Sequence, residues 1–430
     1  MRGWMIAMAA LLLPGAAVAQ SAVTVIHAGR LLDRPGRAPR GPSTIVVQGG
    51  KIVSVADGLR PAPAGARLVD LGDRFVLPGL IDSHVHLDSD AGGNAGLIEG
   101  LTTSDSAAAF RAVANARKTL DAGFTTVRNL GGPAAIMALR DAIRDGIVPG
   151  PRILDAGNGI STTSGHGDGS VGLSEELGRA VPGDNLCDGA DACRRAVRLQ
   201  VRRGVDVIKT MTTGGVNSRI GAGLGAQMFG DEIKAIVETA HLYGKKVAVH
   251  AHGSDGINMA LAAGADSIEH GTLIDAESIR LFKASKAYYV PTLSTVNGYL
   301  ERIAADANAY PPAVRAKINW RIKITGEALR KAYPAGVQIA FGTDAGVSKH
   351  GRNADEFELM VEHGMPAGEA IKAATVNAAA LLGISAEAGT IEPGKRADII
   401  AVTGDPLRDV TVLKRVGFVM SDGVVRKDAR

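Results

Sequence analysis

The stretch "LPGLIDSHVHL", residues 77–87, places His84 and His86 on either side of one valine at the end of an apolar run. In a β-strand, residues two positions apart point to the same face. The two imidazoles therefore project together, whereas Val85 points to the opposite face. A lone histidine at such a position is more often structural than a ligand, so the role of this pair depends on the polar residues around it.

The rest of the chain alternates apolar, β-branched runs with amphipathic helical segments. Two such segments, residues 106–123 and 231–244, have the length and period of helices, and the second ends at a glycine typical of a helix C-terminus. Repeated strand–helix units predict an α/β fold with a closed (β/α)8 TIM barrel, in which chemistry lies where the strands end. The predicted strands are residues 79–85, 124–130, 151–157, 205–211, 246–252, 266–272, 288–294 and 337–346.

Short β-branched runs broken by glycine occupy both ends of the chain instead. They cover residues 23–76 and 389–427, and a chain of 430 residues is long enough for one large domain with an appendage. We therefore expect a small β-sandwich domain built from residues 20–76 and 386–430, beside a barrel of residues 77–385.

The first twenty residues, "MRGWMIAMAALLLPGAAVAQ", contain one arginine, a short apolar stretch and the small residues Ala17 and Ala19 around a valine. This pattern is typical of a secretory signal peptide. The apolar stretch is shorter than the ~20 residues that a membrane span needs. We expect a signal peptide over residues 1–19, an exported (periplasmic or secreted) protein, and no membrane attachment after its removal.

Charge and cysteine content limit the other partners. The net charge of +4 and the pI of about 9.0 come from scattered basic residues without interleaved aromatics, so we expect no nucleic-acid partner. Two cysteines, Cys187 and Cys193, lie close enough in sequence for a local disulfide, and two free thiols are the alternative. A structural zinc site there is not favoured, because no further cysteine or nearby histidine completes four ligands.

Polar residues fall at the ends of the predicted strands, where inward-facing positions should otherwise be apolar. Imidazoles and a carboxylate that converge at one barrel mouth suit a divalent metal such as zinc. The candidates are His84, His86, Lys209, His250, His252, His270 and Asp344.

The motifs around these residues resemble those of the amidohydrolase superfamily of metal-dependent hydrolases, over nearly the whole chain after the leader. The motifs are "DSHVHL" (82–87), "GVDVIKTM" (204–211), "VAVHAHG" (247–253), "SIEHGT" (267–272), "FGTDAG" (341–346) and "AATVNAAALLG" (373–383). The resemblance implies two divalent metal ions, zinc above all, with His84, His86 and Asp344 holding one ion and His250 and His270 the other.

The same resemblance implies that Lys209 is carboxylated by CO2 to N6-carboxylysine and bridges both ions, and that Asp344 is the catalytic general base. Carboxylation matters because a protonated ammonium cannot ligate a cation, whereas a carbamate presents two anionic oxygens. The alternatives are a salt-bridged or solvated lysine at position 209 and a capping aspartate in a turn at position 344.

Within the superfamily the chain looks most like the Xaa-Pro dipeptidase-like and carboxypeptidase-like members, a group that includes enzymes hydrolysing ochratoxin A to phenylalanine and its isocoumarin acid. The resemblance rests on residues 123–132, 161–169, 187–198, 209–218 and 247–253. It implies hydrolysis of the amide bond to a C-terminal amino acid in a small N-acyl or aminoacyl substrate. It also implies a homo-oligomer, commonly an octamer.

Four residues near the strand ends are candidate substrate contacts. His166, in a glycine-rich loop, could meet a substrate carboxylate, and His252 could hydrogen-bond the scissile carbonyl or the carboxylate. The amides of Gly214 and Gly215 offer donors without steric bulk. The alternatives are a turn held by neighbouring glycines for His166 and an orienting role for His252.

Two features leave the specificity open. Asn129 stands where similar sequences more often have an aspartate, which puts an orienting carboxylate there in doubt. The wall of the pocket could be apolar or polar, and neither set is favoured. The apolar candidates are Met228 and Phe229, and the polar ones are Arg219, Lys349 and Arg352.

Other functions remain open at this point. A deaminase or a cyclic amide or imide hydrolase could occupy the same barrel, but no glutamate follows closely after His250, and Lys209 argues for two metals. A non-catalytic metal-binding scaffold would bind metal without turnover of any amide.

Overall fold

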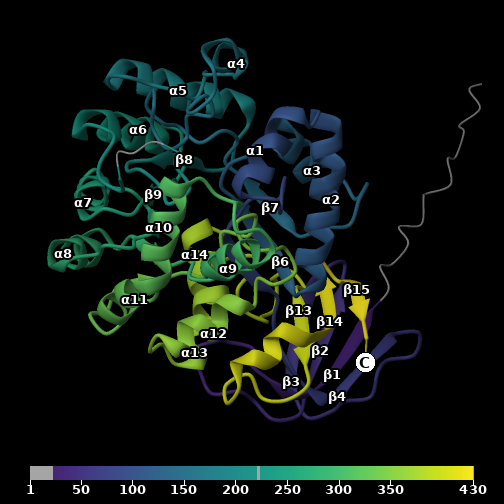
Figure 1. Cartoon of the computed structure of the whole chain (residues 1–430). Coiled ribbons are helices and arrows are strands. Elements are labelled where there is room, and N and C mark those ends of the chain that lie inside the picture. The colour runs from purple at the N-terminus through teal and green to yellow at the C-terminus, as the bar shows by residue number, and fades with distance from the viewer. Residues whose placement is uncertain (1–22, 220–222, 430) are drawn as a thin grey trace, which may run out of the picture.

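The computed structural model describes residues 23–219 and 223–429 (Figure 1). The predicted signal peptide, residues 1–19, lies outside the described residues. At the centre are two parallel sheets, one with the order β5-β6-β7 and one with the order β12-β11-β10-β9-β8. Their strands are β5 (Leu80–Val85), β6 (Phe124–Asn129), β7 (Arg152–Asp155), β8 (Ile208–Met211), β9 (Val247–Ala251), β10 (Ser267–His270), β11 (Tyr288–Val290) and β12 (Gln338–Ile339).

Hydrogen bonds join the two sheets at both of their edges. At one edge the Asp344 N–H donates to the His84 carbonyl at 2.8 Å, and the His86 N–H donates to the Ala345 carbonyl at 2.7 Å. At the other edge the Ile160 N–H donates to the Lys209 carbonyl at 2.8 Å. The predicted α/β fold is confirmed, and these two seams support the predicted closed barrel.

Helices connect the central strands and surround them (Figure 1). The predicted helices 106–123 and 231–244 are α2 and α6, and Gly244 follows the second with φ +66°, as expected for a glycine after a helix. The helices are α1 (Gly93–Thr102), α2 (Asp105–Asp121), α3 (Ala134–Arg144), α4 (Glu175–Ala180), α5 (Ala190–Arg203), α6 (Gly230–Leu242), α7 (Ser254–Ala262), α8 (Ala276–Ser285), α9 (Thr295–Ala305), α10 (Pro312–Lys323), α11 (Glu327–Ala332), α12 (Asp355–Glu362), α13 (Ala367–Lys372), η1 (Ala373–Asn377), α14 (Ala378–Leu382) and η2 (Val410–Arg415).

The last predicted strand, residues 337–346, was too long. Regular strand ends at Ile339, and the backbone takes positive φ at Asp344 (+57°) and Gly346 (+119°). A residue in the left-handed region cannot continue an extended strand. The segment leaves the sheet there and carries Asp344 to the mouth.

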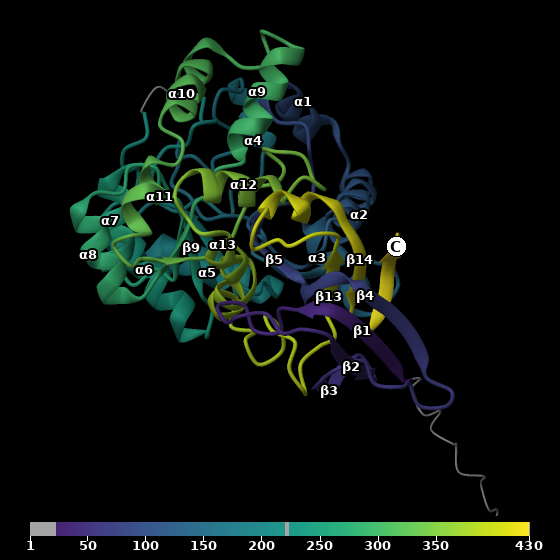
Figure 2. The same cartoon turned by 90° about the horizontal axis from the view of Figure 1, so that it is seen from below.

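Strands from both ends of the chain form one further sheet, with the order β15-β14-β13-β4-β1-β2-β3. Figure 2 shows these strands gathered on one side of the helices and central strands. A domain shared by both termini is therefore observed, whereas its division into two packed layers stays a prediction. The strands are β1 (Thr24–Leu31), β2 (Ser43–Gln48), β3 (Lys51–Asp57), β4 (Arg67–Pro78), β13 (Ile399–Val402), β14 (Val416–Ser421) and β15 (Val424–Asp428).

Among the helices of the described part of the chain, none combines the length and the apolar composition that crossing a membrane requires.

Candidate active site

The strand ends bring the predicted polar residues into one cavity. His84 is the last residue but one of β5, Lys209 lies on β8, His250 on β9 and His270 at the end of β10, and all are buried. Asp344 enters from the segment after β12 and is 8% exposed. The cavity is lined by His84, His86, Leu130, His166, Lys209, Met211, Val216, Asn217, His250, His252, His270, Thr295, Tyr299, Arg321, Asp344 and Val347.

Two groups of side chains in this cavity place their ligand atoms within 4.8 Å of one another: His84, His270 and Asp344 form one, and His250, His252 and His270 form the other. His86 also reaches the first group, because its Nε2 lies 3.3 Å from Asp344 Oδ1. The sequence predicted His84, His86 and Asp344 for one ion and His250 and His270 for the other. The structure adds His252 to the neighbourhood of the second set.

The hydrogen bonds of the histidines show which ring nitrogens are free to bind a cation. His84 Nδ1 donates to Glu269 Oε2 at 2.9 Å, and His86 Nδ1 donates to the Gly131 carbonyl at 3.1 Å. His270 Nδ1 lies 2.7 Å from Thr292 Oγ1, whose proton goes to the Pro291 carbonyl. In each neutral ring the Nε2 lone pair is therefore left to face the cavity.

The Asp344 carboxylate meets two of these lone pairs. Its Oδ1 lies 3.5 Å from His84 Nε2 and 3.3 Å from His86 Nε2. Acceptors that face each other at these distances need a proton or a cation between them. The donor set, imidazole nitrogen with carboxylate oxygen, is the set that zinc and similar divalent ions bind. The residues therefore fit a metal site.

Electrostatics in the cavity favour the neutral imidazole at His84, His250 and His270, and the charged one at His86. Burial, with a smaller contribution from Lys209, lowers the pKa of His84 to about 4. Burial likewise holds the pKa values of His250 and His270 well below the ordinary value. For His86 burial opposes the charge, but the Asp344 carboxylate prevails and raises the pKa. A neutral imidazole is the form that coordinates a metal.

Lys209 is 3% exposed and lies among these rings. Burial lowers the pKa of its ammonium to about 8, although Glu269 and Asp344 act in the opposite direction. Because burial disfavours the charged ammonium, the neutral amine is far more populated here than in an ordinary lysine. The structure thus places Lys209 where the sequence predicted it.

Two residues that the sequence did not single out hold His84 in place. Glu269 Oε1 accepts from Arg128 Nη2 at 2.8 Å and from Ser267 Oγ at 2.6 Å, while its other oxygen holds His84. Both charged side chains are fully buried, and burial alone would raise the pKa of Glu269, but Arg128 and His84 lower it to about 2. Glu269 lies directly before His270 in "SIEHGT", a position that the alternation rule assigns to the opposite face of the strand.

The ring of His166 stacks on the ring of His250, with ring centroids 4.1 Å apart. Its Nδ1 is 2.6 Å from Ser218 Oγ, which in turn accepts the Gly215 N–H at 3.0 Å. Burial, followed by Lys209, lowers the pKa of His166 to about 4. His166 is therefore a neutral ring that is held through Nδ1.

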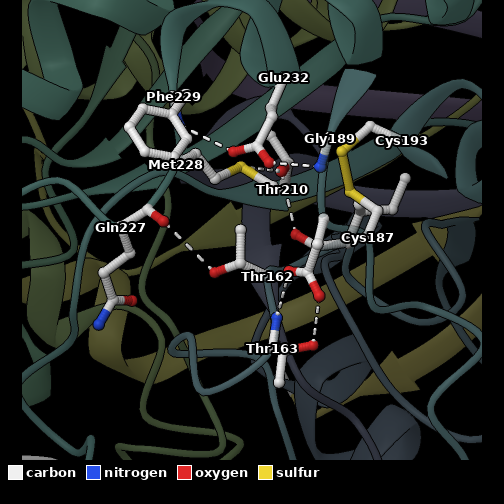
Figure 3. The surroundings of a disulfide bond; sticks show 12 residues. Thr162, Thr163, Cys187, Gly189, Cys193, Thr210, Gln227, Met228, Phe229 and Glu232 are labelled. Carbon is white, nitrogen blue, oxygen red and sulfur yellow. Dashed lines mark hydrogen bonds between the residues drawn. A yellow bond between two sulfur atoms is a disulfide. The ribbon is translucent and has the colours of Figure 1, made fainter. Parts of the chain in front are cut away.

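The disulfide between Cys187 and Cys193 lies near Thr162 and Thr163, which precede His166 in its loop (Figure 3). The Cys187 N–H donates to the Ser161 carbonyl at 2.8 Å, five residues before His166. On the other side, Gln227 accepts the His166 N–H at 2.9 Å through Oε1. Of the two states that the sequence left open for the cysteines, the structure has the disulfide.

The other predicted substrate contacts lie in or beside the cavity. His252 Nδ1 is bonded to Thr272 Oγ1 at 2.8 Å, and its ring stacks on His270 with centroids 5.0 Å apart. The Gly214 N–H donates to the Gly225 carbonyl at 3.1 Å, and the Gly215 N–H is taken by Ser218. Both glycine amides are thus engaged within the protein, and their contact with a substrate stays a prediction.

Asn129 has a role that an aspartate could not fill in the same way. Its Nδ2 donates to Asp155 Oδ1 and to the Gly131 carbonyl, both at 2.9 Å, and its Oδ1 accepts the Leu87 N–H at 2.9 Å. An ionised carboxylate here would face the Asp155 carboxylate. The amide instead braces the Gly131 carbonyl, which holds His86.

The pocket-wall candidates fall in two places. Arg219 donates to Asn94 Oδ1 at 3.0 Å, and Arg352 and Lys349 are paired with Glu301 on α9, so these three are not among the residues lining the cavity. Met228 is buried beneath Thr210, and Phe229 is exposed. The cavity wall is instead supplied by α9 and α10 through Thr295, Tyr299 and Arg321, which the sequence did not predict.

Comparison with known proteins settles the family. The model of the amidohydrolase family matches residues 75–426. The chain belongs to the amidohydrolase family. This amidohydrolase is 34% identical over 412 residues to an ochratoxinase from Aspergillus niger, with 92% of this chain and 84% of that protein covered.

Solved structures agree. A crystal structure of a Xaa-Pro dipeptidase with bound methionine is similar with a TM-score of 0.89 and 41% identity, covering 94% of this chain and 99% of that one. A prolidase complexed with N-methylphosphonate-L-proline is similar with a TM-score of 0.85 and 30% identity, covering 94% and 100%. The amidohydrolase is thus a hydrolase acting on amide bonds, and its His and Asp groups could hold metal, as the metal dependence of the family requires.

Proposed function

We propose that this amidohydrolase uses two divalent metal ions to hydrolyse the amide bond to a C-terminal amino acid in small N-acyl or aminoacyl compounds. The observation that carries the proposal is the convergence of Asp344 Oδ1 with the Nε2 atoms of His84 and His86. The similarity to an ochratoxinase and to Xaa-Pro dipeptidases supports the choice of this amide, with ochratoxin A and Xaa-Pro dipeptides as candidate substrates.

His84, His86 and Asp344 would hold one ion, and His250 and His270 the other, with zinc as the expected metal. Lys209, carboxylated by CO2, would bridge the two through its carbamate oxygens. The buried position of Lys209 supports this modification, because the free amine reacts with CO2 and burial favours that amine. When bound, the ions would lower the pKa of a water molecule and polarise the carbonyl under attack.

The protein's own residues would move the proton and orient the substrate. Asp344 lies beside the ring nitrogens that would bind one ion. From there it would accept the proton of the attacking water and pass it to the leaving nitrogen. His252, fixed by Thr272, is placed to hydrogen-bond the scissile carbonyl or the carboxylate. His166 would hydrogen-bond a substrate oxygen through Nε2.

Three further parts of the proposal concern the protein as a whole. Export through the leader at residues 1–19 would bring it to the periplasm or the medium. A disulfide between Cys187 and Cys193 is compatible with such an oxidising compartment. We also propose assembly into a homo-oligomer, with eight subunits as the first state to test by light scattering.

The test is a release assay on purified mature protein with zinc and bicarbonate, together with metal content per chain. The panel contains Xaa-Pro dipeptides, N-acyl amino acids and ochratoxin A, and free amino acid is measured. Turnover with about two metals per chain, lost by a factor of about 10³ or more in Asp344→Asn, is expected. Two bound metals without release from any substrate would discard the C-terminal amide and redirect the search to cyclic amides.

A further inference from the structure

Arg321 is a buried cation in the wall of the cavity. It lies on α10, is 3% exposed and lines the same cavity as His252 and Asp344. Its Nη1 donates to Thr325 Oγ1 at 3.2 Å, which is a neutral partner one helical turn further along. Within residues 23–219 and 223–429, no Asp or Glu side chain comes within 4.0 Å of its guanidinium.

The groups that act on Arg321 electrostatically do not neutralise it. They are the phenols of Tyr289 and Tyr299 and the carboxyl of Glu356. Burial raises the pKa of both phenols, so they stay uncharged. The oxygens of Glu356 are taken by the backbone N–H groups of Leu293 and Ser294, at 2.9 and 2.7 Å, and burial raises its pKa to about 7. A buried guanidinium without an anion is costly to the folded protein.

Arg321 is also held firmly in position. One turn earlier on α10, Lys317 Nζ donates to the carbonyls of Gly215 and Ser218, at 2.9 and 2.7 Å. The same Ser218 holds His166 through its hydroxyl. The helix is thereby fixed against the loop that borders the cavity, so Arg321 does not have to be ordered when a ligand arrives.

Among the described residues that line the cavity, Arg321 is the one fixed cation outside the predicted metal site. The side chains that accompany Arg321 in the wall, Asn217, Thr295 and Tyr299, are neutral, and His166 and His252 have pKa values lowered by burial. A planar guanidinium presents two parallel N–H groups that match the two oxygens of a carboxylate. A carboxylate is therefore the ligand group that completes this wall.

We propose that Arg321 binds the α-carboxylate of the C-terminal amino acid and so restricts the enzyme to substrates with a free carboxylate. This proposal rests on the proposed function, because it assigns one end of the substrate within the same cavity. Turnover then falls steeply when the C-terminal carboxylate is replaced by a neutral carboxamide, even though the scissile bond is unchanged.

The test compares two substrates and three variants. The substrates are the N-acetyl-L-amino acid that the wild-type protein cleaves fastest and its C-terminal carboxamide. The variants are Arg321→Met, Arg321→Lys and, as a matched control on the exposed side of the same helix, Lys323→Met. Arg321→Gln replaces the methionine variant if that protein is not soluble.

We expect Arg321→Met to lower kcat/KM for the free acid about 10- to 100-fold, mainly through KM, and to leave the carboxamide within about threefold. Arg321→Lys restores part of the activity on the acid, because it keeps the charge but not the planar pair of donors. Lys323→Met leaves kcat/KM unchanged for both substrates. The melting temperature of Arg321→Met without substrate does not fall, since the variant removes an uncompensated buried charge.

Equal losses on the acid and the carboxamide, or unchanged turnover of the acid, would overturn the role of Arg321 and leave the amide hydrolase intact. A fall in melting temperature with equal losses would assign Arg321 to the fold instead. If the wild-type protein, with two metals bound, cleaves neither substrate, the proposed function fails, and this inference fails with it.

Discussion

At the scale of single residues, the site is built from pairs in which a side chain or a backbone carbonyl fixes the tautomer of a histidine. Glu269 holds His84, Thr292 holds His270 and the Gly131 carbonyl holds His86. The residues at the strand ends were predictable, because two-residue alternation and strand-end position single them out. Glu269 and Arg128 were not, because they lie 141 residues apart in sequence and neither follows the alternation that marks the candidate ligands.

A prediction for the metal site follows from Glu269. In Glu269→Gln the neutral amide cannot pair with the charge of Arg128. Its NH2 group is a donor and would face either His84 Nδ1 or Arg128 Nη2, which are donors themselves. We expect metal affinity to fall about 10- to 100-fold, measured by competition with a chelating dye. Glu387→Gln, a surface change far from the cavity, is the control. Unchanged affinity in Glu269→Gln would show that His84 does not need this partner.

At the scale of elements, loops supply residues of the site that the strands do not carry, among them His166 and Gly215. The Gly215 backbone lies against the ring of His166, so that a Cβ added at Gly215 would come within 2.3 to 2.7 Å of three ring atoms. The sequence predicted Gly215 as a hydrogen-bond donor to a substrate, because a glycine has no side chain to block its N–H. It did not predict that the ring of His166 lies against Gly215. The loop conformation that joins residues 166 and 215 depends on contacts across the chain, which no local pattern encodes.

Gly215→Ala is expected to displace the His166 ring and to lower kcat/KM about tenfold or more, with the fold retained, since the ring must move to relieve the contact. Kinetics and circular dichroism measure the two effects. Gly230→Ala is the matched control, because a Cβ at Gly230 meets nothing within 4 Å. Equal activity of the two variants would mean that the position of His166 does not affect turnover.

The disulfide gives a second prediction at this scale. Its cysteines are six residues apart, and closing so short a loop stabilises the protein by about 2 kcal/mol in the chain-entropy description. The double variant Cys187→Ser, Cys193→Ser should lose about this free energy of unfolding, measured by urea denaturation. Wild-type protein treated with reductant should match it, and a loss well below 1 kcal/mol would contradict the stabilising role.

At the scale of the whole molecule, buried charges join the terminal sheet to the central strands. Asp398, directly before β13, lies 3.6 Å from Arg152 on β7, and its Oδ1 accepts the Asp422 N–H at 2.8 Å. Burial raises the pKa of Asp398 to about 6, although Arg152 acts against this. The sequence predicted a shared terminal domain from its strand pattern, but not the side chains at this junction, which come from three distant segments.

This raised pKa predicts how stability depends on pH. The folded protein holds the Asp398 proton more tightly than the unfolded chain does, whose value is near 3.8. The resulting stabilisation is complete below pH 3.8 and is lost as pH rises through about 6. Relative to wild type, Asp398→Asn should therefore gain up to about 3 kcal/mol between pH 4 and pH 7. Denaturation at several pH values measures this, and a difference independent of pH would contradict it.

The seam between the first and the last central strands has a consequence for how the chain folds. Thr343 Oγ1 donates to Asp82 at 2.7 Å across 261 residues of sequence, and Asp344 meets His84 and His86 directly beside this contact. Contacts of such long sequence separation form late and slow folding. During synthesis a chain that ends before this segment lacks Asp344 although it already carries His84 and His86, so the predicted ligand set is complete only after residue 344 has been added.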